Sequence, residues 1–586
     1  MFEKVLVANR GEIAIRVMRT LEELGIGTVA VYSEPDRDGP HVRRAAEAYL
    51  LGPGPSTESY LVVEKILDVA EKSGAEAIHP GYGFLAENAA FARACHEAGL
   101  TFIGPPADAI EAMGSKTHAR ELMKGAGVPI VPGTTDPVET VEDANRLIEE
   151  VIGYPVAIKA AGGGGGKGFR VAESQDQLEK AFEGASREGE KFFSDSTVYL
   201  ERYLPDPRHV EVQVLADAHG NVVHLFERDC SVQRRHQKLI EESPAPAVDP
   251  ELRERIGKIG TDAARAVGYR SAGTVEGLLQ DGDYYFLEMN TRVQVEHCVT
   301  EMVTGIDIVR EQLKIARGEE LSFDQDDVVI RGHAIECRIN AEDAGKSFAP
   351  APGKIGSYRE PAGPFVRVDS GAEEGYEVLP LYDPMIAKLI VWDVDRQAST
   401  RRMLRALGEY EIEGLKTLIP FHRALLDTEQ WARGETCRDL VEDKEWLGQL
   451  AFPKQPEAEE AEEPETAERE YAVEVSGRKF DVKVIGPPVS PDGAAPAAAR
   501  KAPQRRQRGG GGGGGAPGAL VSPIQGTVLR VAVEQGAEVD EGALICVIEA
   551  MKMENEITAP SAGTIEELGV SEGGSIATGD TIAVIK

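Results

Sequence analysis

A stretch of low-complexity sequence divides this chain into two unequal parts. Residues 487–518 are rich in proline, alanine and glycine, and Gly509–Gly515 is an uninterrupted run of seven glycines. Glycine at this density cannot hold a fixed fold, so the stretch is predicted to be a flexible tether. A tether of about 30 residues has a root-mean-square reach on the order of 30 Å. The chain is therefore expected to fold as a large body and a small C-terminal domain that can visit more than one place.

The C-terminal segment, residues 519–586, has the pattern of a small all-β domain. Valine, isoleucine and leucine recur at strand-like intervals, and glycines separate the runs, in Val521–Val533, Gly542–Glu549, Glu554–Ala559 and Thr564–Leu568. Similar Pro-to-Gly turns at Pro523–Gly526 and Pro560–Gly563 predict a flattened barrel made of two similar halves. Lys552, between Met551 and Met553, is expected on an exposed turn between two strands. The alternative is an ordinary surface lysine.

Composition excludes several classes of protein. The 586 residues suggest about three to four domains. A formal net charge of −35, from 99 acidic and 64 basic residues, argues against nucleic-acid binding. Such an acidic excess is typical of proteins in a high-salt cytoplasm, where ions screen self-repulsion, so we hypothesise a halophilic source. The sequence has no apolar run of about 18 residues, so no membrane span is expected. The N-terminus has the pattern of a strand rather than of a signal peptide, and six scattered cysteines without a CxxC pair fit a reducing cytoplasm.

The body is expected to contain several α/β and α+β domains. Residues 1–113 alternate strand and helix patterns, which predicts a parallel, Rossmann-like sheet. Residues 114–330 mix helices with β segments and contain most of the polar motifs, and residues 331–446 have the pattern of a further α+β unit. Residues 447–518 are predicted to be a linker that includes a β-hairpin at 471–485.

The glycine run Gly162–Gly168 does not fit a nucleotide-binding P-loop. That pattern needs Gly-x4-Gly-Lys-Ser/Thr at the start of a helix, whereas here Lys167 precedes another glycine. The flanking Pro155–Lys159 and Phe169–Ala172 have strand patterns. A glycine-rich hairpin that folds over phosphates as a lid fits better, because bare N–H groups can approach anionic oxygens closely. A surface loop without such a role is the alternative.

Two carboxylates and an amide are predicted to share one face of a second hairpin. If Gly282 is the centre of its turn, Glu276 falls opposite Glu288, and Asn290 points to the same side. Oxygen ligands of this kind suit Mg2+ or Mn2+ that bridges nucleotide phosphates. A solvated outer face is the alternative, but opposed like charges are destabilising without a cation.

Charged residues follow this hairpin and also form a dense block earlier in the chain. Arg292 could hold bicarbonate while Glu296 accepts its proton. Basic groups in Phe226–Lys238 suit phosphate or carboxylate, although a solvated face is the default for such a block.

Several motifs together resemble biotin carboxylase, a member of the ATP-grasp superfamily, over about residues 1–446. They are Val5–Ala14, His79–Asn88, Cys230–Lys238 and Glu288–Arg292. Glu549–Met553 looks like the biotin attachment site of a biotinyl, lipoyl-like carrier domain. The whole chain is therefore similar to the α subunit of an acyl-CoA carboxylase. The resemblance implies a biotin carboxylase N-terminal domain (1–113), an ATP-grasp domain (114–330, lid about 131–203), a biotin carboxylase C-terminal domain (331–446) and the carrier (519–586).

The resemblance also implies roles for individual residues. It gives Glu296 as general base, Arg338 as the group that stabilises the biotin enolate, and Arg292 and Lys238 as further catalytic groups. Glu276, Glu288 and Asn290 match metal ligands, and Lys552 matches the biotin attachment site. The remaining matches are ATP and lid residues Lys116, Lys159, Gly163, Gly164, Gly165, Gly166, Glu201 and Leu204, pocket residues His209, Gln233 and His236, bicarbonate residues Gln294 and Val295, and the biotin-contacting Tyr82 and Gly83.

The implied reaction is ATP-dependent carboxylation of carrier-bound biotin by bicarbonate through carboxyphosphate. Biotin, ATP and Mg2+ or Mn2+ are the implied cofactors. The linker is too short for an acyl-CoA carboxyltransferase, so a β subunit on a separate chain is expected. The hairpin at 471–485 is either part of the docking surface for that subunit or a small linker module. Biotin protein ligase and further copies of the same chain are the other expected partners. A non-catalytic biotinylated carrier and a pyruvate carboxylase subunit remain alternatives.

Overall fold

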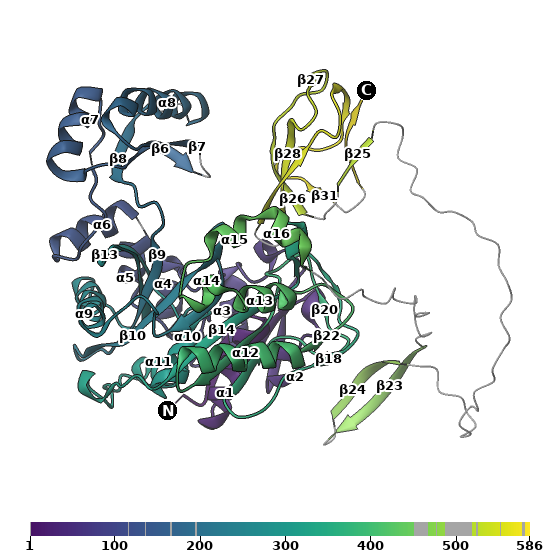
Figure 1. Cartoon of the computed structure of the whole chain (residues 1–586). Coiled ribbons are helices and arrows are strands. Elements are labelled where there is room, and N and C mark those ends of the chain that lie inside the picture. The colour runs from purple at the N-terminus through teal and green to yellow at the C-terminus, as the bar shows by residue number, and fades with distance from the viewer. Residues whose placement is uncertain are drawn as a thin grey trace. The chain divides into compact units, whose positions relative to one another are not determined.

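The computed structural model describes residues 2–114, 116–134, 136–164, 167–193, 196–450, 467–475, 478–486, 519–522, 526–550, 553–576 and 580–586. Lys552, Gly165 and Gly166, which carry sequence predictions, lie outside these residues. The chain forms two compact units, one made mainly of residues 1–452 and the other mainly of residues 453–586. We call the first unit the body, and residues 519–586 of the second the carrier (Figure 1).

The N-terminal part of the body is a parallel sheet, as its alternating sequence predicts. Five strands lie in the order β3-β2-β1-β4-β5, and each neighbouring pair is parallel. Strands β1 and β2 are almost wholly buried, and Val17 and Leu21 of α1 pack into the same core as Val5 and Val7. The elements are β1 (Lys4–Val7), α1 (Gly11–Glu23), β2 (Gly27–Ser33), α2 (Pro40–Arg44), β3 (Glu47–Gly52), α3 (Val63–Ser73), β4 (Ala77–His79), α4 (Ala89–Glu97), β5 (Thr101–Phe102) and α5 (Ala107–Gly114).

The described residues before Gly165 and after Gly166 form an antiparallel pair of strands, as predicted. Strands β6 and β7 pair with each other, and β8 completes a three-stranded sheet in the order β7-β6-β8. Leu178 and Phe182 of α8 pack against Val156 and Ile158 of β6. Strands on both sides of the run, rather than a strand and a helix, explain why the P-loop pattern fails. The elements are α6 (Lys116–Gly125), α7 (Val141–Leu147), β6 (Val156–Gly164), β7 (Lys167–Ala172), α8 (Gln175–Phe193) and β8 (Val198–Arg202).

An antiparallel sheet of eight strands forms the centre of the body. Its order is β13-β12-β9-β10-β11-β14-β21-β19, and β11 pairs with β14, so the sheet is continuous across residue 330. The strands are β9 (Arg208–Ala216), β10 (Val222–Arg234), β11 (Gln237–Ser243), β12 (Ser271–Gln280), β13 (Asp283–Asn290), β14 (His333–Asn340), β19 (Val366–Ser370) and β21 (Met385–Asp393). The accompanying helices are α9 (Pro250–Ala266), α10 (His297–Thr304), α11 (Ile308–Ala316), α12 (Arg396–Glu409), α13 (Ile419–Leu426), α14 (Glu429–Ala432), α15 (Arg438–Glu442) and α16 (Lys444–Gln449).

Short strands complete the body, and a separate hairpin follows it. The short strands are β15 (Glu342–Asp343), β16 (Ala349–Pro350), β17 (Gly353–Lys354), β18 (Tyr358–Arg359), β20 (Glu377–Val378) and β22 (Glu411–Ile412). The predicted linker hairpin is confirmed as the antiparallel pair β23 (Ala467–Val475) and β24 (Arg478–Gly486).

The carrier consists of two four-stranded sheets, which confirms the predicted barrel of two halves. Their orders are β25-β32-β30-β27 and β29-β28-β26-β31. Val528, Ile545, Ile548, Ile565 and Ile582 contribute to the buried core that the two sheets share. The strands are β25 (Ala519–Val521), β26 (Gly526–Val531), β27 (Glu538–Val539), β28 (Leu544–Ala550), β29 (Met553–Thr558), β30 (Gly563–Leu568), β31 (Ser575–Ile576) and β32 (Thr581–Ile585).

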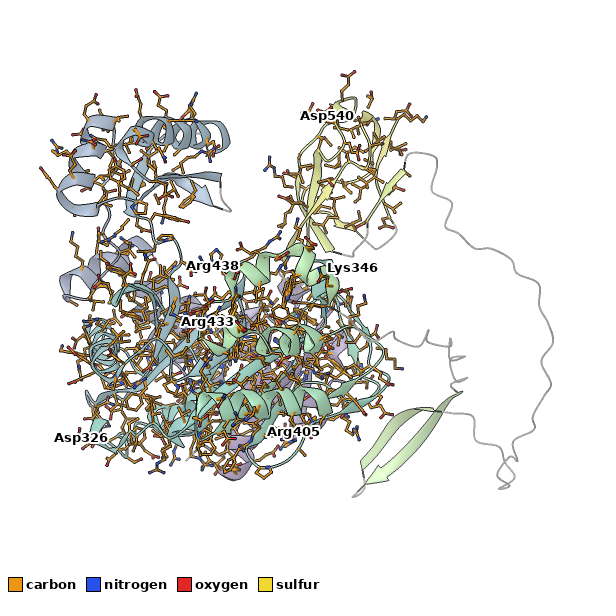
Figure 2. All side chains as sticks on the ribbon, viewed as in Figure 1. Asp326, Lys346, Arg405, Arg433, Arg438 and Asp540 are labelled. Atoms are coloured by element: carbon orange, nitrogen blue, oxygen red, sulfur yellow. The ribbon has the colours of Figure 1, made fainter. Side chains whose placement is uncertain are left out.

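Charged side chains project outward from both units. Asp326, Lys346, Arg405 and Arg433 on the body and Asp540 on the carrier are exposed (Figure 2). Within the described residues, every helix is too short or too polar to cross a membrane.

Candidate active site

The two carboxylates predicted as metal ligands face each other across a hairpin. In the antiparallel pair β12 and β13, Glu276 lies opposite Glu288, and the turn falls at Asp281 and Gly282, whose φ angles are 54° and 83°. Asn290, two residues beyond Glu288, donates its Nδ2 to Oε1 of Glu276 at 2.7 Å. The predicted register is confirmed, and the two carboxylates and the amide lie on one face of the hairpin.

Lys238 on β11 brings three carboxylates together at the centre of the body. Its Nζ lies 2.5 Å from Oε2 of Glu211, 2.9 Å from Oε1 of Glu276 and 2.6 Å from Oε1 of Glu296. All four side chains are buried. Glu211, on β9, is opposite Glu276 in the sheet, which explains why both carboxylates reach the same lysine. Three anions packed this closely need the cations that surround them.

Glu296 is ionised in this environment. It is the residue before the first turn of α10, and its Oε2 accepts a hydrogen bond from Nη2 of Arg338 at 2.9 Å. Burial alone would raise the pKa of Glu296, but Lys238 and Arg338 hold it below its ordinary value. Arg338 is held in turn by Glu241, whose Oε1 accepts from Nε at 2.5 Å. Glu296 is therefore an anion at neutral pH that can accept a proton.

His209 adds a further positive charge. Its Nε2 lies 2.9 Å from Oε2 of Glu276 and 3.8 Å from Oε2 of Glu211. Burial would lower the pKa of His209, but these two carboxylates raise it to about 9. The imidazole is therefore protonated at neutral pH and helps to neutralise the carboxylate cluster.

Arg292 joins the hairpin of β12 and β13 to the N-terminal part of the body. Its Nε donates to Oε2 of Glu87 at 2.8 Å, and its Nη2 donates to Oδ1 of Asn290, also at 2.8 Å. Gln294, two residues on, donates Nε2 to Oε1 of Glu276 at 2.5 Å. The loop that precedes Glu296 is therefore fixed to the predicted metal ligands.

The predicted nucleotide residues lie on the lid and beside it. Lys159 on β6 forms an ion pair with Glu201 on β8, and the second oxygen of Glu201 accepts from Nη1 of Arg120 at 3.1 Å. Leu204 follows β8, and Gly163 and Gly164 end β6. Gly165, Gly166 and the side chain of Lys116 lie outside the described residues.

The remaining predicted pocket residues lie in turns and loops. Gln233 is near the end of β10 and donates Nε2 to the carbonyl of Cys230 at 2.7 Å. His236, in the turn between β10 and β11, has a φ of 67°. Tyr82 and Gly83 follow β4. Lys552 lies outside the described residues, between the end of β28 at Ala550 and the start of β29 at Met553.

Two buried residues that sequence reasoning missed organise the site. Arg228, fully buried, donates to Oε1 of Glu211 at 2.6 Å and to Oε1 of Gln294 at 3.0 Å. It lies in the charged block whose default interpretation was a solvated face. The role of Glu211 could have been predicted from the sequence. Polar residues at 209, 211 and 213 alternate with valines, and this alternation indicates a strand with one polar face.

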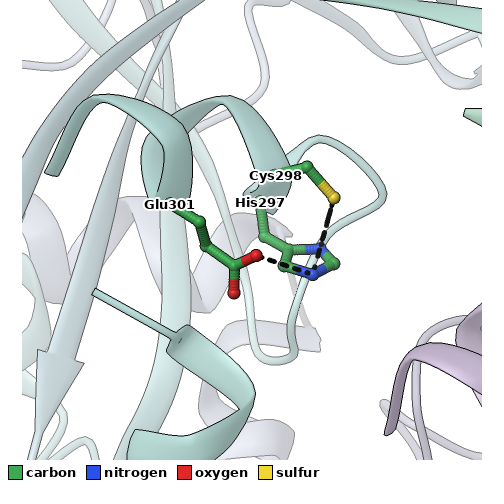
Figure 3. A group of neighbouring side chains, drawn as sticks. All are labelled: His297, Cys298 and Glu301. Atoms are coloured by element: carbon green, nitrogen blue, oxygen red, sulfur yellow. Dashed lines mark hydrogen bonds and ion pairs between the residues drawn. The ribbon is translucent and has the colours of Figure 1, made fainter. Parts of the chain in front are cut away.

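His297, Cys298 and Glu301 form a second group of possible metal ligands (Figure 3). Glu301 already accepts from Arg16 at 2.8 Å, and Sγ of Cys298 lies 3.2 Å from Oδ2 of Asp369. Burial raises the pKa of Cys298 well above its ordinary value and lowers the pKa of His297 to about 3. A protonated thiol and a neutralised carboxylate are poor ligands, so we assign no metal to this group.

Comparison with protein families matches four segments of the chain. Residues 1–110 match the N-terminal domain of biotin carboxylase, 115–352 the ATP-binding domain of the carbamoyl-phosphate synthase L chain, and 336–443 the C-terminal domain of biotin carboxylase. Residues 518–585 match the family described as biotin-requiring enzyme.

Individual relatives agree with these matches. The biotin-dependent acyl-coenzyme A carboxylase alpha3 subunit of Mycobacterium leprae is 48% identical over 594 residues, which cover 100% of this chain and 98% of that protein. A pyruvate carboxylase subunit of Methanothermobacter thermautotrophicus is 56% identical over 443 residues, 76% of this chain and 90% of that protein. The biotin carboxylase domain of Hydrogenobacter thermophilus 2-oxoglutarate carboxylase, solved as a dimer with MgADP, ADP and bicarbonate, is 49% identical with a TM-score of 0.69, and the match covers 77% of this chain and 100% of that one.

The fold and these matches define a biotin-dependent carboxylase with an ATP-grasp body and a biotinyl carrier on one chain. Within that class, the chain belongs to the biotin carboxylase and carrier-containing α-subunit family of biotin-dependent acyl-CoA carboxylases. It is an enzyme, an ATP-dependent biotin carboxylase, and biotin and ATP are its cofactors. The predicted family, fold class and type of enzyme are therefore confirmed.

Proposed function

We propose that the chain is the α subunit of an acyl-CoA carboxylase whose acceptor is propionyl-CoA or acetyl-CoA. One observation carries this proposal. The likeness to the Mycobacterium leprae acyl-CoA carboxylase subunit extends over the whole chain, including the linker and carrier. The second candidate is a pyruvate carboxylase subunit. It is favoured by the Methanothermobacter relative, which has the higher identity, 56%, over a match of 443 residues. Both candidates share the biotin-loading reaction and differ in the acceptor.

The acceptor reaction is proposed to take place on another chain. Residues 447–518, between the body and the carrier, are too few for a carboxyltransferase domain, which needs a core on the order of 100 residues or more. A separate β subunit is therefore the proposed partner, and biotin protein ligase is proposed to modify Lys552. The dimer formed by the Hydrogenobacter domain supports self-association of the body. Six free, buried cysteines fit the predicted reducing cytoplasm.

A divalent cation fits the hairpin of Glu276 and Glu288. Directly opposed carboxylates repel each other, and a cation between them would offset that repulsion. We assign Mg2+ or Mn2+ to Glu276, Glu288 and Asn290, where it would supply charge neutralisation for nucleotide phosphates. The MgADP in the Hydrogenobacter structure supports this assignment.

The other nucleotide contacts are proposed from the lid and the central sheet. Lys116 and Lys159 would contact phosphates beneath the lid at Gly163–Gly166. Glu201 and Leu204 would contact adenine. His209, Gln233 and His236 would line the pocket. The ion pair of Lys159 with Glu201 supports this assignment, because the proposed phosphate contact and the proposed adenine contact are neighbours.

Glu296, Arg292 and Arg338 are the proposed chemical groups. Arg292, Gln294 and Val295 would hold bicarbonate, and ionised Glu296 would accept its proton. The bicarbonate oxygen then attacks the γ-phosphorus, ADP leaves, and carboxyphosphate forms. Carboxyphosphate breaks down to CO2 and phosphate, and this phosphate accepts the ureido proton. Lys238 would stabilise the anionic charge.

Lys552 would hold biotin, which would supply a ureido nitrogen as the acceptor for CO2 when bound. Arg338, already oriented by Glu241 and Glu296, would place its guanidinium against the ureido oxygen, where negative charge develops. Tyr82 and Gly83 would contact the bicyclic ring.

The test uses the native complex, captured from its source through biotin at high salt. Labelled bicarbonate, ATP and Mg2+ are supplied with propionyl-CoA, acetyl-CoA or pyruvate in parallel. Label in an acyl-CoA is the expected result and ranks the two substrates. Label in pyruvate alone would overturn the proposed acceptor and favour the second candidate, with the loading reaction unchanged.

A further inference from the structure

Lys388 on β21 is a fully buried lysine that no predicted role explains. Its side chain is 0% exposed, and it lies opposite Arg338 in the pairing of β14 with β21. Nζ donates to the carbonyl oxygen of Val295 at 2.8 Å and to Sγ of Cys298 at 3.2 Å, and it lies 3.4 Å from Oε2 of Glu12. Val295 and Cys298 use two of the three donors of the ammonium group, whereas the contacts with Glu12 and with Oδ2 of Asp369, at 3.9 Å, are ion pairs. Lysine is almost never buried unless it is paired, so this arrangement calls for a reason.

Glu12 extends the contact to the loop of Tyr82. It lies in the first turn of α1, is 4% exposed, and accepts a hydrogen bond from the Tyr82 hydroxyl. The Tyr82 carbonyl is held independently by Nδ2 of Asn9 at 2.8 Å. The Tyr82 loop is therefore fixed at its backbone by one residue and at its ring by Glu12.

The pair of Lys388 and Glu12 thus joins three regions of the chain. Tyr82 and Glu12 lie in the segment that matches the N-terminal domain of biotin carboxylase, Val295 lies in the ATP-binding segment, and Lys388 lies in the C-terminal segment. The lysine is charged. Burial by itself would lower its pKa, but carboxylate neighbours, Glu12 and Asp369 among them, hold that pKa above the ordinary value. A charged group donates stronger hydrogen bonds than a neutral one.

We propose that Lys388 and Glu12 are positioning residues that set the Tyr82 loop and the Val295 loop relative to each other. The inference rests on the proposed function, in which Tyr82 contacts biotin and Val295 contacts bicarbonate. Lys388 fixes the carbonyl of Val295, the residue directly before the general base Glu296. The same ammonium fixes Tyr82 through Glu12. The ion pair of Lys388 with Glu12 would thereby fix the positions of biotin and bicarbonate relative to each other without contacting either of them.

This arrangement predicts different kinetic effects for substitutions of Glu12 and of Lys388. Glu12 lies on the Tyr82 side, so Glu12→Ala is expected to raise the KM for biotin at least tenfold and to change the KM for bicarbonate less than twofold. Lys388 contacts both sides, so Lys388→Met is expected to raise both KM values at least tenfold. Neither residue contacts Lys159 or Glu201, so the KM for ATP should stay within twofold. In the double variant, Glu12→Ala with Lys388→Met, the KM for biotin should be no more than twice that of Lys388→Met alone. The reason is that both substitutions break the same connection between Lys388 and Tyr82.

The experiment uses the full-length chain carrying Lys552→Ala, in which added free biotin is the acceptor. KM values for biotin, bicarbonate and ATP are measured for this parent and for each variant. Glu242→Gln is the matched control, because Glu242 is 5% exposed and paired with His333 at 2.8 Å and Arg396 at 2.6 Å, neither of which has a predicted role. The control should change no KM value more than twofold.

The outcomes separate this inference from the proposed function. A parent that cannot carboxylate free biotin would contradict the proposed function itself. An active parent whose Glu12 and Lys388 variants lose only kcat or thermal stability, with both KM values unchanged, would overturn the positioning role. So would a Glu242→Gln variant with the same KM pattern. If Lys388→Met does not fold, Glu12→Ala decides through its selective effect on the KM for biotin.

Discussion

Arg338→Met replaces a guanidinium held between two buried carboxylates with an apolar side chain of similar length. In the native structure, Nη2 lies 2.9 Å from Oε2 of Glu296, and Nε lies 2.5 Å from Oε1 of Glu241. Both carboxylates are at most 1% exposed, so solvent screens these pairs little. The substitution therefore removes a positive charge from the proposed general base, Glu296, and from the proposed binding place of the ureido oxygen.

The size of the effect follows from these contacts. An opposite charge this close lowers the pKa of a carboxyl group by about 1–3 units, and each unit corresponds to about 1.4 kcal/mol. Loss of Arg338 should raise the pKa of Glu296 by that amount, while Lys238 stays in place. Glu296 accepts a proton only when ionised, so a raised pKa means that activity is lost at a higher pH as the solution is acidified. Loss of a cation aimed at developing charge should also slow biotin carboxylation by about 100- to 1,000-fold.

Two assays on the full-length chain measure these effects. Bicarbonate-dependent ATP cleavage is followed against pH, and its acid limb should move up by about 1–3 pH units. Transfer of labelled bicarbonate to biotin is followed at the optimum pH of each variant. The Kd for ATP should stay within twofold, because the contacts of Arg338 are with Glu241 and Glu296. Arg338→Lys, which keeps the charge without the planar fork, should give a smaller shift. An unmoved acid limb together with near-normal label transfer would refute the reasoning.

Four further results are expected. Glu296→Ala should abolish label transfer to biotin while the Kd for ATP changes little, and near-normal turnover would reject Glu296 as the base. Arg228→Met, which takes one buried cation away from Glu211 and leaves Lys238 as its partner, should destabilise the chain by about 3–5 kcal/mol, whereas Arg265→Met on the surface of α9 should cost under about 0.5 kcal/mol, as thermal unfolding can show. Burial raises the pKa of Glu342 to about 7. As pH rises from about 4.5 to 7, the free energy of unfolding of the native chain should therefore fall by on the order of 3 kcal/mol relative to that of Glu342→Gln. Parallel curves of unfolding free energy against pH for the two chains would contradict this. Activity and stability should rise with KCl because the net charge is −35, and full activity without added salt would count against the halophilic hypothesis.

Local patterns in the sequence were sufficient to predict the structure of several elements. The turn at Gly282 sets the register of its hairpin, so the facing of Glu276 and Glu288 could be predicted from spacing alone. The two Pro-to-Gly turns and alternating apolar residues of the carrier likewise predict its two sheets. In each case, the interacting residues are close in sequence, and strand periodicity decides which face they occupy.

The connections that assemble the site could not be predicted in this way. Lys238 meets Glu211, Glu276 and Glu296 across separations of 27 to 58 residues, and the pairing of β9 with β12 decides which carboxylates are near. Lys388 lies 93 residues from Val295. A buried charge in a strand has the same local sequence signal as a charge on a solvated face, so Arg228 could not be distinguished from a surface arginine without the tertiary structure.

The central claim is that the body transfers carboxyl from bicarbonate to the carrier at Lys552. The most direct measurement incubates the biotinylated full-length chain with ATP, Mg2+ and labelled bicarbonate, and then quantifies and maps the label bound to protein. Label that requires ATP, maps to Lys552 and is absent from both the Lys552→Ala and the Glu296→Ala chains is the predicted result. Equal protein-bound label in the Lys552→Ala chain, or no label in the native chain, would contradict the account.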